Sequence, residues 1–146
     1  MNVYDAELPH EPEAERRAGY VERYLRFGPT IGAKKIGMTI YELEEGQRIC
    51  PYHYEIGNEE WLIVLEGEPT LRTPDGEQRL VPGDVAVFPD GPDGAHSVSG
   101  PGRVVMVSTK IDPSGSVYPD SNKIGVWPLG KLFRLDDDVD YFEGEQ

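Results

Sequence analysis

The sequence has a single cysteine in 146 residues, so no disulfide can form within the chain. This suits the reducing conditions of a cytoplasm, and we expect a cytoplasmic protein. The first residues also lack a basic stretch followed by an apolar one, which is the pattern of a secretory signal. No apolar run approaches the roughly 20 residues that a membrane-spanning helix needs. The sequence therefore predicts a protein that is neither exported nor inserted in a membrane.

Positive charge is scarce as well. Lys and Arg number 14 against 27 Asp and Glu, which gives a formal net charge of -13. A nucleic-acid duplex or an anionic membrane would repel such a chain. The first 30 residues are also too short and too acidic for a helix-turn-helix DNA reader. We expect a small-molecule ligand or substrate and no nucleic-acid partner.

Internal repeats and long amphipathic helices are missing too. Short apolar runs recur instead, among them residues 61–65, 85–88 and 103–108, with turn signals every eight to twelve residues. This rhythm is typical of an all-β sandwich or barrel. The clearest local element is TLRTPDGEQRL, residues 70–80, because Pro74, Asp75 and Gly76 favour a tight hairpin turn.

The composition divides the chain into three parts. Residues 1–30 are polar and punctuated by proline and glycine, so we predict an irregular arm with a short helix from Pro12 to Arg17. Residues 31–110 carry the β pattern and form the predicted barrel. Residues 111–146 are rich in Pro, Gly and Ser and end acidic, which indicates a second arm that wraps around the barrel.

The pattern along the predicted strands indicates that both of their faces are covered. If Glu60 faces inward, then Leu62 and Val64 do so too, and Trp61, Ile63 and Leu65 face outward. Residues 104–107 are likewise apolar on both faces. Strands of this kind need cover on the outer side. The two arms or a second subunit could provide it, and we expect a homodimer.

Histidine is rare, and the positions of two of the three histidines indicate a metal site. His53 and Glu55 share one face of an extended segment, and Glu60 follows the turn-forming pair Gly57 and Asn58. His96 lies in a Gly-rich loop before another strand. Two imidazoles and one or two carboxylates suit a divalent transition metal such as Mn, Fe, Co, Ni or Zn. The alternative for each His taken singly is a structural, hydrogen-bonded side chain.

The spacing of these residues resembles the two motifs of the cupin superfamily. In the first motif, Gly, His-x-His, Glu and Gly follow one another, and in the second Gly, Pro, Gly and His do so. The matching positions are Gly46, His53, Glu55, Glu60 and Gly67, then Gly83, Pro89, Gly91 and His96. The resemblance implies a double-stranded β-helix, or jelly-roll barrel, whose imidazoles point inward and hold a metal ion. The segments YPDSNKIGVWP, residues 118–128, and DYFEGE, residues 140–145, also resemble segments of single-domain bacterial cupins.

Glu55 departs from the motif, because cupins usually carry their second His there. As a fourth ligand it would bring the charge of the site close to zero and weaken the ion as a Lewis acid. If Glu55 points away, His53, Glu60 and His96 form a two-His-one-carboxylate set like that of non-haem iron oxygenases. In a third reading the metal is lost and Glu55 pairs with a basic residue such as Arg48. The other departures, in loop spacing and at Gly100, are minor.

Several functions agree with these residues. An enzyme would perform metal-dependent dioxygenation, decarboxylation or isomerisation of a small oxygenated metabolite, with Tyr41, Arg48 and Tyr54 as candidate substrate-orienting residues. A non-catalytic sensor module would bind a metabolite or a metal. A metal-free epimerase-like cupin would need basic residues inside the barrel, for which Arg72 and Arg103 are the candidates. Fold alone does not decide among these.

Overall fold

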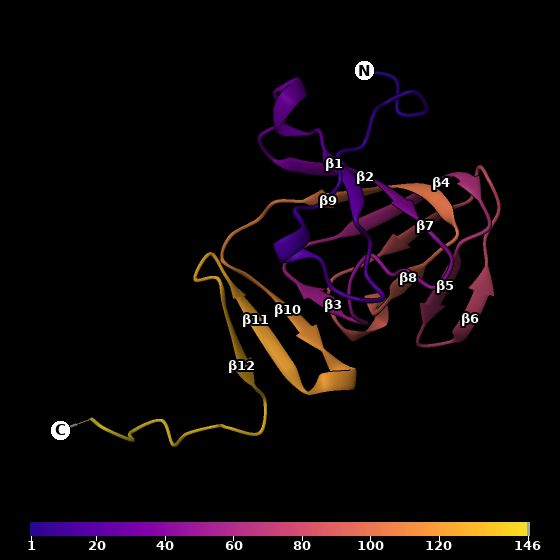
Figure 1. Ribbon diagram of the computed structural model, residues 1–146. Coiled ribbons are helices and arrows are strands. Elements are labelled where there is room, and N and C mark those ends of the chain that lie inside the picture. The colour runs from indigo at the N-terminus through magenta and orange to yellow at the C-terminus, as the bar shows by residue number, and fades with distance from the viewer. Residues whose placement is uncertain (146) are drawn as a thin grey trace.

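A computed structural model describes residues 1–145 of the chain and shows an all-β architecture (Figure 1). Twelve strands form three antiparallel sheets. The helical segments among these residues are four short 3-10 turns: η1 (Glu13–Glu15), η2 (Pro29–Ile31), η3 (Pro92–Gly94) and η4 (Pro119–Ser121). None of the helical segments within residues 1–145 has the length and apolar character that a bilayer-spanning helix requires.

The largest sheet has five strands and forms one wall of the barrel. In spatial order they are β1 (Arg23–Arg26), β2 (Ile36–Leu43), β9 (Gly102–Thr109), β4 (Glu60–Gly67) and β7 (Val85–Phe88). The predicted orientation of β4 is confirmed, because Leu62 and Val64 are buried at 0% and 1% exposure while Trp61 is 44% exposed. The alternation arises because successive side chains of a strand point to opposite faces.

A smaller sheet forms the facing wall. It consists of β6 (Gly76–Arg79), β5 (Thr70–Thr73) and β8 (Ser97–Ser99), in that order. The predicted hairpin is confirmed, since Thr73 pairs with Gly76 across the turn at Pro74 and Asp75. Leu71 and Val98 of this sheet share one buried cluster with residues of the large sheet, so the two inner faces pack against each other. The other members of the cluster are Leu43, Leu62, Val64, Leu80, Phe88, Val104 and Met106.

The N-terminal residues cover part of the outer face of the large sheet. Leu8 and Phe27 are buried against Ile40 and Val105, which lie on the side opposite the barrel interior. The covering segment is not wholly irregular, because β1 adds a strand that pairs with β2 through Arg23 and Glu42. The short helix expected from Pro12 is a single 3-10 turn, η1. The expectation that an arm covers the outer face is thus met over β2 and β9.

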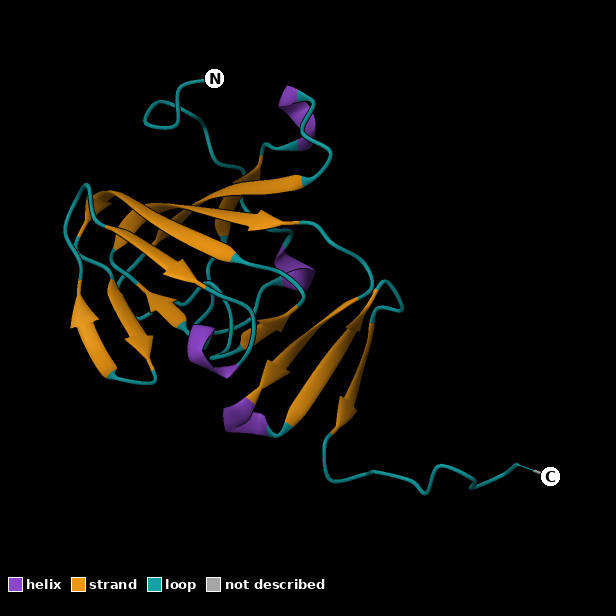
Figure 2. Cartoon of the chain, turned by 180° about the vertical axis from the view of Figure 1, so that it is seen from behind, coloured by secondary structure: helices purple, strands orange, loops and turns teal. Residues whose placement is uncertain are grey.

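The C-terminal part also carries regular structure, which its Pro- and Gly-rich composition had not indicated. A four-stranded sheet orders β12 (Lys131–Arg134), β11 (Lys123–Trp127), β10 (Ser114–Tyr118) and β3 (Tyr54–Ile56). This sheet projects from the barrel, and the chain beyond β12 runs away from the body (Figure 2). Since β3 belongs to the same sheet, the C-terminal strands reach the segment that carries His53 and Glu55.

Candidate metal centre

His53 and His96 are brought together by a short antiparallel pairing between two loop ends. His53 directly precedes β3 and His96 directly precedes β8. The amide of His53 donates to the carbonyl of His96 at 3.1 Å, and the amide of His96 donates back at 2.8 Å. Residues paired in this way project their side chains to the same face. The ring centroids consequently lie 4.8 Å apart, with both rings buried.

The backbone fixes which nitrogen of each imidazole faces inward. The Nδ1 atom of His53 lies 3.0 Å from the carbonyl of Pro51, and Nδ1 of His96 lies 2.9 Å from the carbonyl of Gly94. Because a carbonyl only accepts, Nδ1 carries the proton in both rings. The Nε2 atoms are then left for another partner, which is how metal-ligating histidines are commonly held.

The second of these hydrogen bonds depends on a glycine. A Cβ atom at Gly94 would lie 1.8 Å from the carbonyl oxygen of Pro89, so no other residue fits there without moving the loop. The 3-10 turn η3 can therefore pack closely against Pro89. This packing places the Gly94 carbonyl within hydrogen-bond distance of Nδ1 of His96.

Glu60 completes the group from the first position of β4. Its Oε2 lies 3.4 Å from Nε2 of His96 and 3.6 Å from Nε2 of His53. Within residues 1–145, Oε2 of Glu60 and Nε2 of His96 are buried and have no hydrogen-bond partner. Buried polar atoms without partners are costly, by about 1–3 kcal/mol each. Two such atoms aimed at one point indicate that something else binds there.

Glu55 stands beside this group and has a partner of its own. One of its oxygens accepts a hydrogen bond from the hydroxyl of Ser116 at 2.7 Å, and the same hydroxyl accepts from the indole of Trp127 at 3.0 Å. That carboxylate oxygen is 3.4 Å from Nε2 of His53. The C-terminal sheet therefore sets the position of Glu55, and Glu55 does not pair with Arg48.

Burial and neighbouring charges act oppositely on the two imidazoles. Burial lowers the pKa of His96 to about 4, and the nearby His53 contributes to this. Burial also disfavours the charged form of His53, but its contacts with Cys50, Glu55 and Glu60 outweigh this effect and raise its pKa well above the usual range. His96 is thus neutral at physiological pH, and His53 carries the extra proton that a bound cation would displace.

The residues present fit a divalent ion. The donor atoms of His53, Glu60 and His96 lie within 4.8 Å of one another, and this is the one such group among residues 1–145. Bonds of about 2.0–2.2 Å to one ion place neighbouring ligand atoms roughly 3 Å apart, close to the separations found here. Two neutral imidazoles and a carboxylate suit first-row transition metals. The group could therefore hold such an ion.

A pocket of about 260 Å³ opens onto this group. Its walls include Tyr41, Cys50 and Met106 together with His53, Glu60 and His96. Burial raises the pKa of Tyr41 to about 12, so its phenol stays protonated and can donate a hydrogen bond. Of the three residues expected to orient a substrate, Tyr41 lines this pocket. Arg48 and Tyr54 do not, because Arg48 pairs through its backbone with Ser99 and Tyr54 alternates away from His53 and Glu55.

Arg26 also lines the pocket, and the sequence reasoning missed it. It lies at the end of β1, where its guanidinium stacks 5.1 Å from the ring of Tyr24, which itself packs against Tyr41. It is the one Lys or Arg among the residues that line this pocket. A partial signal was present, because Leu25 and Phe27 flank Arg26 and would share one face of a strand, which leaves Arg26 on the other face. Ser116 and Trp127 gave no such signal.

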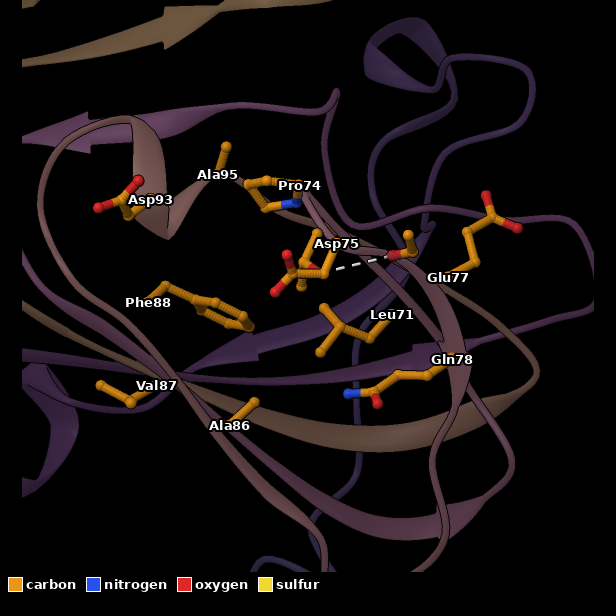
Figure 3. A pocket seen from close by; sticks show the side chains of 12 residues that line it. Leu71, Pro74, Asp75, Glu77, Gln78, Ala86, Val87, Phe88, Asp93 and Ala95 are labelled. Atoms are coloured by element: carbon orange, nitrogen blue, oxygen red, sulfur yellow. Dashed lines mark hydrogen bonds between the residues drawn. The ribbon is translucent and has the colours of Figure 1, made fainter.

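A larger cavity, of about 480 Å³, lies on the other side of Phe88 (Figure 3). The ring of Phe88 stacks on His96 at 3.6 Å between centroids and so separates the two spaces. Asp75, Glu77 and Asp93 line the larger cavity, together with apolar side chains and no His, Lys or Arg. We place the functional site in the smaller pocket, because it holds the imidazoles and the unpartnered carboxylate oxygen.

Comparison with known structures shows the same fold over nearly the whole chain. A candidate sugar phosphate isomerase from Acidithiobacillus ferrooxidans superposes with a TM-score of 0.80 at 23% identity, over 94% of this chain and 91% of that one. A sugar phosphate isomerase of the cupin superfamily from Silicibacter pomeroyi gives 0.77 at 24% identity, over 98% and 97%. A polyketide cyclase from Streptomyces resistomycificus gives 0.56 at 24% identity, over 78% and 81%.

These identities are low, so the likenesses establish the fold alone. No curated protein matches the sequence significantly. Residues 39–109 match the cupin domain family, and this range holds β4 to β9 with both motif histidines. The barrel, the inward imidazoles and the match together confirm the resemblance found in the sequence: residues 39–109 are a cupin domain.

Proposed function

We propose that the protein is a metal-dependent enzyme acting on a small, oxygenated and negatively charged metabolite. The observation that carries the proposal is the pair of buried, unpartnered atoms, Oε2 of Glu60 and Nε2 of His96, which face one point beside Nε2 of His53. His53, Glu60 and His96 would hold the ion, which is one of Mn, Fe, Co, Ni or Zn. When bound, it would polarise a substrate oxygen as a Lewis acid.

The substrate class follows from the pocket walls. Arg26 offers a guanidinium to a carboxylate or phosphate group, and Tyr41 offers a phenolic proton to a neighbouring oxygen. A pocket of about 260 Å³ suits a small molecule. In a protein of net charge -13, the guanidinium of Arg26 at this place favours an anion locally. Isomerisation of a sugar phosphate is the first reaction to assay, since two proteins of the same fold carry that name.

Dioxygenation and decarboxylation remain the other reaction types for such a site, and a metabolite-binding sensor is the non-catalytic alternative. A metal-free epimerase is disfavoured, because it would need basic residues inside the barrel and both candidates are bound elsewhere. Arg72 forms a bidentate pair with Asp120, and Arg103 binds the carbonyls of Val3 and Ala6. Neither lines the pocket. We also propose that the protein is cytoplasmic and works as a homodimer.

The test is the metal content of protein purified without added metal. Mass spectrometry should find close to one transition-metal ion per chain in the unaltered protein. It should find less than a tenth of that in the double variant His53→Ala, His96→Ala, because removing two of three ligands leaves one carboxylate. Circular dichroism checks that the variant is folded.

His10→Ala is the matched control, since His10 is the third histidine and lies exposed in the N-terminal segment. It should keep its metal. Metal retained by the double variant, or missing from the unaltered protein under every growth supplement tried, would contradict the proposed centre. A metal-loaded protein that binds phosphorylated sugars without converting them would support the sensor.

A further inference from the structure

The C-terminal arm, defined here as residues 128–145, is joined to the rest of its chain through the pairing of β12 with β11. Every residue in it is exposed, and β12 is exposed at all four positions. The arm nevertheless contains many large apolar side chains. These are Leu129, Leu132, Phe133, Leu135, Val139, Tyr141 and Phe142, with exposures from 43% to 87%.

Such a composition is unusual for a segment that only meets water. Acidic tails usually have few aromatic and aliphatic residues, and so remain solvated. Here four aspartates lie among four apolar or aromatic residues in LDDDVDYF. In both views the arm runs away from the barrel (Figures 1 and 2). An extended, partly apolar arm whose side chains remain exposed on their own chain indicates a surface on another molecule.

The outer face of the large sheet offers an apolar surface that is left uncovered. We call the exposed part of this face over β4 and β7 the outer patch; it consists of Trp61, Val85 and Val87, exposed between 44% and 57%. The register places Trp61 opposite Val87 and Ile63 opposite Val85, so the side chains form two adjacent rows. The N-terminal segment covers the same face over β2, β9 and the part of β4 that carries Ile63 and Leu65, and it leaves the outer patch exposed. The patch is ordered, because the indole of Trp61 donates to Glu59 at 2.7 Å.

We propose that the C-terminal arm of one copy docks on the outer patch of a second copy, and that this reciprocal exchange forms the dimer. The proposal rests on the homodimer proposed above. It names the surfaces that make the dimer, and it does not depend on the metal centre.

The dimensions permit the exchange. Residues 134–145 in extended form span roughly 40 Å, at about 3.3 Å per residue. A domain of this length has a radius of gyration of roughly 15 Å, so the arm can reach across a neighbouring copy. A standard interface takes about 20–30 residues from each partner. One arm together with the patch residues beside it approaches that number.

The composition of the arm selects a protein surface over the alternatives. Its aspartates and glutamates would be repelled by a nucleic-acid backbone or an anionic membrane. Its aromatic pair, Tyr141 and Phe142, packs edge to face at 4.9 Å and forms one apolar knob at 87% and 71% exposure. Clustered aromatics of this type often carry most of the binding energy at an interface. The second copy is the partner that necessarily carries the uncovered patch.

The test measures the mass in solution of the unaltered protein, of the arm variant Tyr141→Asp, Phe142→Asp, and of the patch variant Trp61→Glu. Light scattering should give twice 16.3 kDa for the unaltered protein and 16.3 kDa for each variant, with the dimer dissociation constant raised at least 100-fold. Ile111→Asp is the matched control, since Ile111 is 55% exposed outside both surfaces, and it should remain dimeric.

Mixing the two variants distinguishes an arm-to-patch dimer from other dimer arrangements. The arm variant keeps an intact patch and the patch variant keeps an intact arm, so a mixture should form a heterodimer held by one docked arm. An arm-to-arm or patch-to-patch dimer would not behave in this way. It would survive one of the two variants and gain nothing on mixing.

The outcomes are distinct from those for the metal centre. A monomeric unaltered protein would overturn the dimer and the exchange together. A dimer that persists in both variants would overturn the exchange alone. Metal content, measured on the same samples, should stay the same in every variant, and so reports on the proposed enzyme independently.

Discussion

At the scale of single residues, the site depends on how each ligand is held rather than on which residue types are present. The Nδ1 protons of His53 and His96 are bound by backbone carbonyls, and this aims both Nε2 atoms at Glu60. Glu55 differs because Ser116 donates to it. This hydrogen bond holds the carboxylate of Glu55 in place. It leaves other lone pairs of the carboxylate free, so Glu55 could still bind an ion.

Replacing Glu55 by His tests its role. The variant restores the residue usual in the cupin motif, so we expect the fold to be retained and the metal preference to move from Mn and Fe toward Co, Ni and Zn, by about tenfold in relative affinity. The reason is that imidazole is a softer ligand than carboxylate. Competition between metals, followed by mass spectrometry, measures the preference.

Glu77→His serves as the control, since Glu77 is exposed on β6 and distant from the imidazoles. It should leave the preference unchanged. Identical preference and affinity in the Glu55 variant would show that Glu55 does not ligate.

At the scale of elements, the two faces of β1 contact different parts of the molecule. Phe27, just after the strand, packs on the outer cluster, while Arg26 faces the pocket beside Tyr41. The strand lies outside the matched cupin residues 39–109. A segment added to the barrel thus supplies the cation that the barrel strands do not place in this pocket.

Arg26→Gln should weaken anion binding about tenfold in the metal-loaded protein, because a charge-assisted hydrogen bond contributes about 1.5–3 kcal/mol. Inorganic phosphate is the probe, and isothermal titration calorimetry measures its affinity. The metal content should not change.

The comparison variant is Arg79→Gln, which removes an exposed arginine of β6 far from the pocket. Phosphate affinity should be unaffected there. Equal losses in both variants would mean that only the total charge matters, and no loss in either would remove Arg26 from the substrate site.

At the scale of the whole molecule, the large sheet is covered on both sides over β2 and β9. The inner cluster faces the small sheet, and the outer cluster lies beneath the N-terminal segment. Since the net charge of -13 opposes compactness, the chain relies on apolar burial on both faces. The division at residues 30 and 110 stays a prediction, and the matched cupin residues lie within its middle part.

Phe27→Ala tests the contribution of the outer cluster. Phe27 is 3% exposed, so its truncation should lower the free energy of unfolding by about 3–5 kcal/mol through lost burial and a residual cavity. Urea denaturation followed by fluorescence measures the change.

Ile31→Ala provides the reference, because Ile31 is 55% exposed in the adjoining turn. Its effect should stay within about 0.5 kcal/mol, as is usual for surface positions. A similarly small effect at Phe27 would mean that the N-terminal segment adds little to the stability of the barrel.

The amino-acid sequence alone was enough to predict the barrel, the inward and outward faces of β4, and the metal-site candidates. These depend on local patterns: alternation along a strand, turn residues such as Pro74 and Asp75, and the spacing of a few rare histidines. Each pattern spans a few residues and needs no knowledge of distant partners.

The residues that surround those candidates could be identified only from the three-dimensional structure. Arg26 lines the same pocket as His53 from a separate strand, and Ser116 donates to Glu55 across 61 residues of sequence. Contacts of this kind depend on how sheets stack and which strands become neighbours. A local pattern therefore shows which side chains point inward, whereas their partners are set by the packing of the whole chain.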